Sequence, residues 1–289
     1  MDVIVADNAS TDDSVEYVQT HFPSVKILVN RSNEGFAGGY NWAMEQINHE
    51  ISILLNSDVE VSEGWIEPVI SLFEKDTTLA AVQPKILDYN KRDQFEYAGA
   101  AGGWIDRYGY PFSKGRIFDS IEKDSHQYDD VSQIFWASGA AMFIRTAIFK
   151  EMKGFDTFFF AHQEEIDLCW RLQLNGHKIV SNSTSTVYHV GGGTLPKSNP
   201  HKTFLNFRNG LEMIFKNSPK KNFYFRIIGR LLFDGLAGLS YLLKGNFKDC
   251  YAIIKAHFAF YRKYFILKQK REIVQVAHEL VSVFDPNIS

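Results

Sequence analysis

Cysteine is scarce in this sequence. Only Cys169 and Cys250 occur among 289 residues, too few and too far apart to indicate a disulfide framework or a cysteine zinc site. The sequence also lacks the basic start and the apolar run that mark a signal peptide. Both absences favour a reducing, cytoplasmic compartment.

Apolar residues, by contrast, are plentiful. They make up 45% of the chain, with 24 Phe and 13 Tyr, which excludes a disordered protein and is ample for a large core. Because the length exceeds that of a typical single domain, we expect one main domain with an appendage. We place the domain at residues 1–195 and a basic, mainly helical region at 196–289.

Charge is divided unevenly along the chain. Residues 197–271 contain 16 Lys and Arg residues against three acids, so this segment carries +13 while the remainder of the chain carries −16. A segment of this kind suits an anionic surface, and a solvated basic face is the alternative.

Short apolar runs that stop at polar residues alternate with segments of helical length in the first part of the chain. The expected buried strands cover 2–7, 25–30 and 51–56, and the expected helices cover 11–22, 35–48 and 62–75, the last with Ser62 as its N-cap. Alternation of this kind predicts an α/β fold. Further strands are expected at 79–87 and 178–190 and a helix at 164–176, whereas 88–130 reads as irregular with short antiparallel strands.

From about residue 203 onward the pattern is helical. Its apolar positions recur at helical spacing: Ile228, Leu231, Leu232, Leu239, Leu242 and Leu243. Arg226, Arg230 and Asp234 lie four residues apart on another side, and three charges argue against a membrane span. We therefore expect the apolar side to pack against the body of the protein, with a membrane-surface position as the alternative.

Polar residues follow several of the expected strands. Asp7, Asn30 and Asp58 each come just after an apolar run, and ligands of α/β proteins bind at the carboxyl ends of parallel strands. A carboxylate held there is a suitable ligand for Mg²⁺ or Mn²⁺, which often bind through one or two protein carboxylates and substrate phosphates. The alternative is that Asp58 caps the following turn.

Two further patterns suggest chemistry. Glu164 and Glu165 begin a helix beside the aromatic residues 158–160, where burial can raise the pKa of a carboxyl and suit it to general base catalysis. His189 precedes three glycines, and its alternatives are a structural role or metal binding.

Seven segments, taken in order, resemble the inverting family-2 glycosyltransferases of the GT-A fold, especially the rhamnosyltransferase-like branch that builds bacterial surface polysaccharides. They are VIVADNASTDDS, NRSNEGFAGGYNWA, LLNSDVEV, WASGAAMFIR, GFDTFFFAHQEEIDLCWRL, VYHVGGGT and KTFLNFRN, and they span residues 3 to about 210. Each is weak alone, whereas their common order is specific. The resemblance implies a mixed, mostly parallel, Rossmann-like sheet flanked by helices, with a helical C-terminal extension.

The resemblance also implies where a nucleotide-sugar would bind. The residues assigned to that site are Asp7, Asn8, Ser10, Asn33, Gly35, Asn41, Asn56 and Asp58. Asp7 would contact the base or the ribose, and Asn56 would donate to the sugar or a phosphate. Asp58 is the surviving acid of a D-x-D-like motif, and with His189 it would hold Mg²⁺ or Mn²⁺.

Members of this family place an acidic pair where this sequence has Glu164 and Glu165, and the second acid is the catalytic base. That base is usually Asp, so the choice between Glu165 and Glu164 stays open here. Trp136, Ser138 and Gly139 match the positions where the acceptor meets the protein.

The implied reaction moves a sugar, with dTDP-rhamnose as a candidate donor, to a lipid-linked or polysaccharide acceptor with inversion. We expect the basic C-terminal region to contact the inner face of the cytoplasmic membrane peripherally, and we expect no nucleic acid as a partner. Family members normally begin with a further strand and helix, so we interpret this sequence as N-terminally shortened. The alternative function is a non-catalytic module that binds a nucleotide-sugar or docks on a membrane.

Overall fold

A six-stranded mixed sheet lies at the centre of the computed structural model, which describes residues 1–117, 120–191 and 199–284. The strand order is β10-β12-β5-β11-β3, and β4 is joined through β12. The strands are β3 (Ile51–Leu55), β4 (Val59–Val61), β5 (Leu79–Asp88), β10 (Val131–Gln133), β11 (Ala141–Arg145) and β12 (Lys178–His189). Because β11 is antiparallel to β3 and β5, while β5 and β12 are parallel, the strands β3, β5 and β12 run in one direction. The mixed α/β class is confirmed, although fewer neighbouring pairs are parallel than expected, because β4, β10 and β11 all pair antiparallel with their neighbours.

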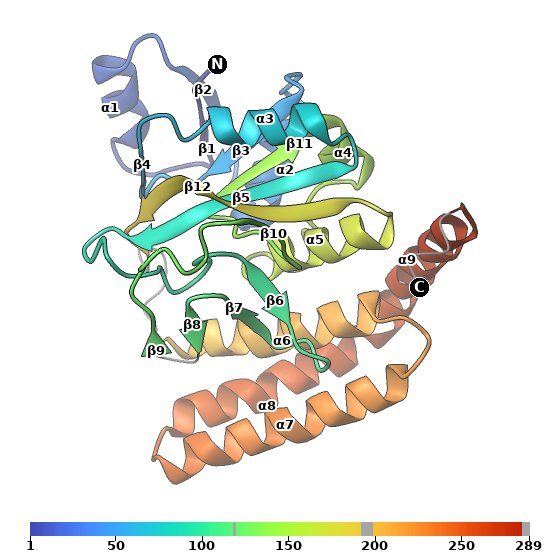
Figure 1. Cartoon of the computed structure of the whole chain (residues 1–289). Helices are drawn as coiled ribbons and strands as arrows, with labels where there is room; N and C mark the ends of the chain where they lie inside the picture. The colour runs from blue at the N-terminus through green and yellow to red at the C-terminus, as the bar shows by residue number, and fades with distance from the viewer. Residues whose placement is uncertain (118–119, 192–198, 285–289) are drawn as a thin grey trace.

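Helices cover both faces of this sheet (Figure 1). On one face α3 (Glu67–Lys75) packs Val69 and Phe73 against Phe143 of β11. On the other face, α2 (Gly35–Glu45) and α5 (Glu164–Leu174) share a core with Met142. Successive side chains of a strand point to opposite faces, so neighbouring positions of β11 serve two separate cores.

The N-terminal elements form a small unit of their own. β1 (Ile4–Asp7) and β2 (Lys26–Val29) form a parallel pair, and α1 (Ser14–His21) connects them in the chain. Over the described ranges neither strand pairs with the central sheet. Val3 and Val29 are 57% and 53% exposed, and α1 buries none of its residues. The prediction of buried strands here is therefore wrong, because two strands without further neighbours leave much of their surface uncovered.

The region expected to be irregular does contain short antiparallel strands. They are β6 (Gly103–Ile105), β7 (Pro111–Ser113), β8 (Arg116–Ile117) and β9 (Ser120–Ile121). After β11 comes the short helix α4 (Thr146–Glu151). One boundary prediction is wrong: Ser62 is not a helix cap, because its hydroxyl and its N–H both donate to the carbonyl of Thr186 and hold the chain beside β12.

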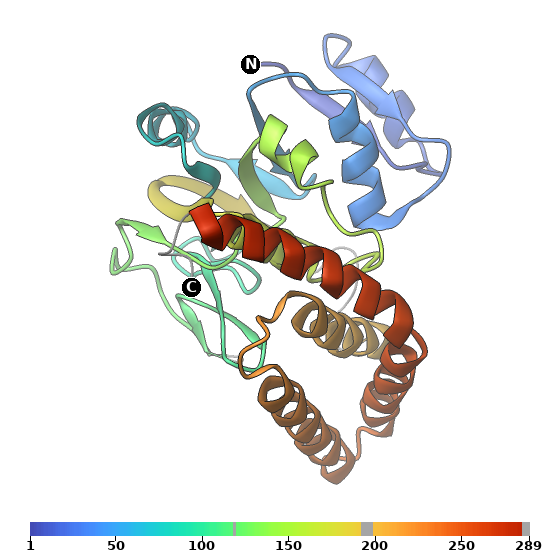
Figure 2. The ribbon, with the colours of Figure 1, turned by 90° about the vertical axis from the view of Figure 1, so that its right-hand side faces the viewer.

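Between residues 199 and 284 the chain forms four helices. They pack against one another, as Figures 1 and 2 show. They are α6 (Pro200–Asn217), α7 (Phe223–Leu243), α8 (Phe247–Arg262) and α9 (Tyr264–Phe284). Helix α6 packs against α5, and its second half, 209–217, is buried throughout. In the part of the chain that the structure describes, no helix combines the length and the apolar character that crossing a membrane requires. The domain boundary predicted at residues 195 and 196 lies outside the described residues.

Helix α7 is oriented opposite to expectation. Its buried residues are Arg230, Asp234 and Gly238. Asp234 accepts hydrogen bonds from Arg230 Nε at 2.9 Å and from the Tyr110 hydroxyl at 2.6 Å, which fastens α7 to the segment before β7. Of the six predicted apolar positions, five are exposed and only Leu231 packs against a core cluster, so the predicted packing of the apolar side against the body is wrong. The buried ion pair and its hydroxyl partner decide which side faces inward, since an unpaired buried charge would be costly.

Candidate functional site

Asp58 and His189 meet beyond the carboxyl ends of β3 and β12. Strand β4 pairs with β12 and places Val59 opposite His189. Asp58, which directly precedes Val59, therefore brings its carboxylate to the imidazole of His189. Asp58 Oδ1 lies 3.2 Å from His189 Nε2. The two residues that the sequence assigned to a metal are therefore adjacent.

Glu96 lies on the other side of the same imidazole. Its Oε1 is 3.6 Å from His189 Nδ1, and its side chain is only 7% exposed. Burial lowers the pKa of His189, but the Glu96 and Asp58 carboxylates outweigh it and raise that pKa above its ordinary value. Sequence reasoning missed Glu96, because it stands in the segment of weak periodicity and only the fold brings it to His189.

The residues at this point fit a divalent cation. Asp58 offers a carboxylate oxygen and His189 an imidazole nitrogen, and such ions often take only one or two protein ligands beside water and substrate phosphates. A carboxylate behind the second imidazole nitrogen is the usual companion of a metal-binding histidine. The donor set thus agrees with the predicted Mg²⁺ or Mn²⁺ site.

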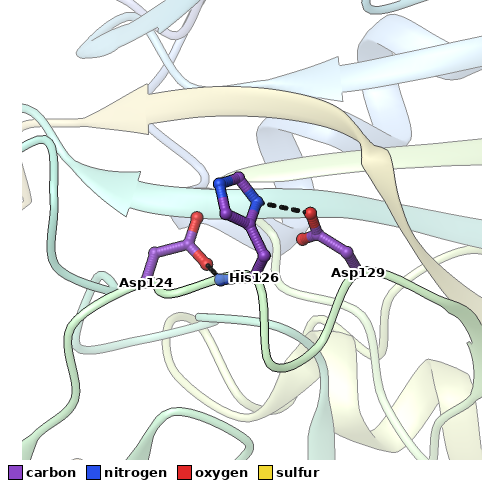
Figure 3. Close-up of side chains that lie close together, drawn as sticks. All are labelled: Asp124, His126 and Asp129. Carbon is purple, nitrogen blue, oxygen red and sulfur yellow. Dashed lines mark hydrogen bonds and ion pairs between the residues drawn. The ribbon is translucent and has the colours of Figure 1, made fainter.

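A second group of potential metal ligands lies in the loop between β9 and β10. Asp124, His126 and Asp129 place ligand atoms within 4.8 Å of one another. Figure 3 shows the three side chains gathered in this loop. The ammonium group of buried Lys85 bonds Asp124 Oδ2 at 2.8 Å and also bonds Asp129 Oδ1. His126 Nδ1 also lies 2.6 Å from Asp129 Oδ2. Because Lys85 pairs with both acids and His126 contacts one of them, the arrangement is accounted for as an ion-pair network.

Glu164 and Glu165 occupy the first turn of α5, as predicted. The Oε2 atoms of both are buried and have no hydrogen-bond partner. Burial raises the pKa of Glu165 to about 7, against the opposing effect of backbone hydrogen bonds in the helix start. Burial and the neighbouring Glu165 charge raise the pKa of Glu164 well above its ordinary value. Glu165 keeps part of its surface accessible, whereas Glu164 is 4% exposed, so Glu165 is better placed to receive a proton from a bound molecule.

The segment 138–140 connects the two halves of the site. A β-carbon on Gly139 would lie 3.9 Å from Glu165 Cβ and 2.9 Å from the Phe36 ring, so this glycine leaves no room for a side chain. The next residue, Ala140, accepts a hydrogen bond from Asn56 N at 3.0 Å. Glu165 and the strand end that carries Asp58 therefore flank the same stretch of backbone.

Asn8 organises the residues assigned to the nucleotide. Its Nδ2 donates to Gly35 O at 2.9 Å and to Asn33 Oδ1 at 3.2 Å, and its Oδ1 accepts from Asn30 Nδ2 at 3.2 Å. Asp7 is buried and accepts from Ser10 N. These contacts join the ends of β1 and β2 to the start of α2.

Three of the predicted site residues make structural contacts. Asn41 bonds both backbone groups of Phe155, with distances of 2.8 and 2.9 Å. Trp136 is buried and donates to Trp104 O at 2.9 Å, while Ser138 is buried and its N–H donates to Gln83 Oε1 at 2.7 Å. Of the three residues assigned to the acceptor, Gly139 is the one whose position lies beside Glu165.

Comparison with solved structures agrees with this architecture. The chain is similar to GalNAc-T7 crystallised with UDP, GalNAc and Mn²⁺, with a TM-score of 0.56 and 16% identity over 77% of this chain and 43% of that one. It is also similar to residues 1–349 of TarS from S. aureus, with a TM-score of 0.52 and 14% identity over 97% of this chain and 80% of that one. At these identities the likeness concerns the fold, which is that of GT-A glycosyltransferases.

The curated relatives of this chain have low sequence identity to it. The N-acetylglucosaminyl-diphospho-decaprenol L-rhamnosyltransferase of Mycobacterium tuberculosis is 24% identical over 65% of this chain and 66% of its own length. The low-salt glycan biosynthesis hexosyltransferase Agl10 of Haloferax volcanii is 20% identical over 71% and 64%. The chain thus spans about two thirds of the length of these relatives. The family described as glycosyl transferase family 2 matches residues 1–148, just over half of the chain, and the protein belongs to that family.

Proposed function

We propose that this protein transfers a sugar from a nucleoside-diphosphate donor to a glycan or lipid-linked acceptor, with inversion and with the help of a divalent cation. Membership of a glycosyltransferase family supports the reaction class. The observation that carries the site assignment is that Glu165 and the Asp58 strand end flank the backbone at 138–140. A displacement at an anomeric carbon needs a general base for the attacking hydroxyl and positive charge for the leaving diphosphate, and these two groups of residues would supply them.

Asp58 and His189 would hold the cation, and Glu96 would orient the imidazole. When bound, the cation would supply positive charge against the diphosphate that leaves the sugar. Glu165 accepts the proton of the acceptor hydroxyl while the hydroxyl oxygen forms its bond to the anomeric carbon. The bond from that carbon to the diphosphate oxygen breaks on the opposite side, so a single displacement inverts the configuration.

The proposed donor is a nucleotide-linked deoxyhexose such as rhamnose, and the proposed acceptor is a sugar on a polyprenyl diphosphate. Both rest on the name of the mycobacterial relative, which transfers L-rhamnose to such an acceptor. A raised pKa suits Glu165 to this task, because a base with a pKa near the working pH is both ionised and able to accept a proton.

The outward face of α7 and α8 supports contact with an anionic membrane surface. Its exposed apolar residues are Ile228, Leu232, Leu236, Leu239, Leu243, Phe247, Tyr251, Ile254 and Phe258. The acids between residues 199 and 271 are Glu212, Asp234 and Asp249, and all three are buried. Exposed lysines such as Lys244, Lys248 and Lys255 therefore set the charge beside this face, as in helices that lie in a membrane interface.

A panel of nucleotide-sugars tests the reaction. With Mn²⁺ or Mg²⁺ and a polyprenyl-diphosphate acceptor, we expect release of the nucleoside diphosphate and a product of inverted anomeric configuration, measured by NMR. Full activity of Asp58→Ala or Glu165→Ala would overturn the site assignment. Nucleotide binding without transfer from any donor in the panel would contradict the proposed reaction.

A further inference from the structure

The turn that precedes the acidic pair is built from unfavourable backbone conformations. Phe160, His162 and Gln163 have φ angles of 66°, 70° and 72°, in the left-handed region that side chains of this size rarely adopt. Glu164 and Glu165 follow immediately. Such a conformation persists only where surrounding contacts enforce it, and it fixes the direction in which the helix starts.

Asn209 of α6 supplies those contacts. Its Nδ2 lies 3.2 Å from Phe159 O, 2.8 Å from Ala161 O and 2.7 Å from His162 O, so its two N–H groups serve three carbonyls of one turn. Asn209 is completely buried. The amide orientation is determined, because carbonyls only accept and because Arg208 Nε donates to Asn209 Oδ1 at 2.9 Å.

Other contacts place the same turn between α6 and the donor side of the site. Arg208 Nη2 donates to Phe159 O at 3.1 Å, and Gln163 Nε2 donates to Asn206 O at 3.1 Å. On the opposite side, Ala37 N approaches Phe160 O at 3.4 Å, and a β-carbon on Gly35 would come within 2.7 Å of that oxygen. The turn therefore has little freedom to shift while Asn209 holds it.

We propose that Asn209 is a positioning residue of the transferase site, which holds the 159–163 turn so that Glu165 faces the acceptor. This inference rests on the proposed role of Glu165 as the base. It also makes helix α6 part of the machinery rather than a separate attachment.

Asn209→Ala tests the proposal in the full chain, with Asn182→Ala as a matched control. Asn182 is also buried, but it bonds Thr184 within β12. We expect Asn209→Ala to lower kcat by about 10- to 100-fold with the KM for the donor changed by less than about threefold, since small displacements of a reacting group cost rates of that order. The acidic limb of its pH profile should move below pH 7, because a released turn exposes Glu165 to solvent. Asn182→Ala should lose stability without either change.

Two further variants separate the possible failures. If Asn209→Ala does not fold, Arg208→Ala, which removes a contact to the same turn from a less buried position, should lower kcat in the same way. An unchanged kcat and pH profile in whichever of these variants folds would overturn the positioning role. Retained activity of Glu165→Gln would instead mean that the proposed base is wrong.

Discussion

The Asp58 carboxylate and the His189 imidazole, 131 residues apart in sequence, lie 3.2 Å apart in the folded protein. Asp58 lies between β3 and β4, and His189 is the last residue of β12. Since β12 pairs with both β4 and β5, it delivers the imidazole to the place where Asp58 and Glu96 converge.

Cation binding should depend on these residues. We expect Asp58→Ala and His189→Ala to abolish Mn²⁺ binding measured by calorimetry in the presence of a nucleoside diphosphate. Glu96→Gln should weaken it by about tenfold, the lower end of the effect typical for residues that support a ligand. Asp124→Asn is the control, because it alters the Lys85 network alone. Loss of binding in that variant, with Asp58→Ala unaffected, would place the ion in the other loop.

Catalysis should require ionised Glu165. We expect Glu165→Gln to reduce kcat by about 10²- to 10⁴-fold, the usual contribution of a general base. In the unaltered protein the rate should rise with pH through about 7, because the base must lose its proton first. Glu164→Gln should cost much less. A larger loss in Glu164→Gln than in Glu165→Gln would reverse the assignment.

The same carboxyl should reduce the stability of the fold as the pH rises from about 4.5 to about 7. Its pKa is about 7 in the folded protein and near 4.5 ordinarily, so between these values the folded state binds more protons than the unfolded state. Stability therefore falls as pH rises through this window. We expect Glu165→Gln to stabilise the fold by about 3 kcal/mol at pH 8 and by much less at pH 4.5. A gain independent of pH, in urea unfolding at both values, would contradict this explanation.

Asp167 should matter more for stability than an exposed acid. It is fully buried, and its carboxylate bonds Arg171 Nε at 2.9 Å, Lys216 Nζ at 2.7 Å and Asn217 Nδ2 at 2.7 Å. Asp167→Ala removes the carboxylate that Arg171 and Lys216 share, and only Lys216 keeps a second acid, Asp156. Because this breaks a buried ion-pair network, we expect a loss of about 3–5 kcal/mol in urea unfolding. Asp93→Ala breaks the exposed pair with Lys123 and should cost far less, because solvent screens exposed ion pairs. Similar losses of unfolding free energy in Asp167→Ala and Asp93→Ala would show that burial does not determine how much each ion pair stabilises the fold.

The outward face of α7 and α8 should bind anionic vesicles. We expect Leu232→Ser combined with Leu243→Ser to weaken binding to phosphatidylglycerol-containing vesicles about tenfold, since both side chains are exposed and available for insertion. Phosphatidylcholine vesicles and 0.5 M salt are the controls, and both should reduce binding of the unaltered protein. Unchanged vesicle binding in the double variant would contradict a membrane role for this face. If the unaltered protein is an oligomer and the double variant is a monomer, the face contacts another copy of the chain instead.

Much of the fold follows from local patterns. The apolar runs at 51–56, 79–87 and 178–190 became β3, β5 and β12, and the acidic start at 164 began α5 as expected. The runs at 51–56 and 79–87 are mostly apolar, as is typical of strands that are covered on both faces. The helix at 164 is identified by its periodicity. The shorter runs at 2–7 and 25–30 also became strands, β1 and β2, and the segment 11–22 contains α1. Only their expected burial is wrong, since these elements have few neighbours to cover them.

Helix α7 shows why periodicity alone is insufficient. The pattern identified its apolar side and its charged side correctly. It could not reveal that Tyr110 and His257 would meet Asp234 and draw the charged side inward. Those partners lie on other elements, and only their convergence makes a buried ion pair tolerable.

The sequence by itself determined the membership of a family, the alternation of strands and helices, and the identity of Asp58, His189, Glu164 and Glu165 as the residues to examine. Local spacing and residue chemistry suffice for these, because they depend on neighbours in the chain. Tertiary structure alone decided that Glu96 supports His189, that Asn209 holds the turn before Glu165, and that Trp136 and Ser138 are buried. These relationships join positions tens of residues apart, and only packing and hydrogen bonding in the folded chain establish them.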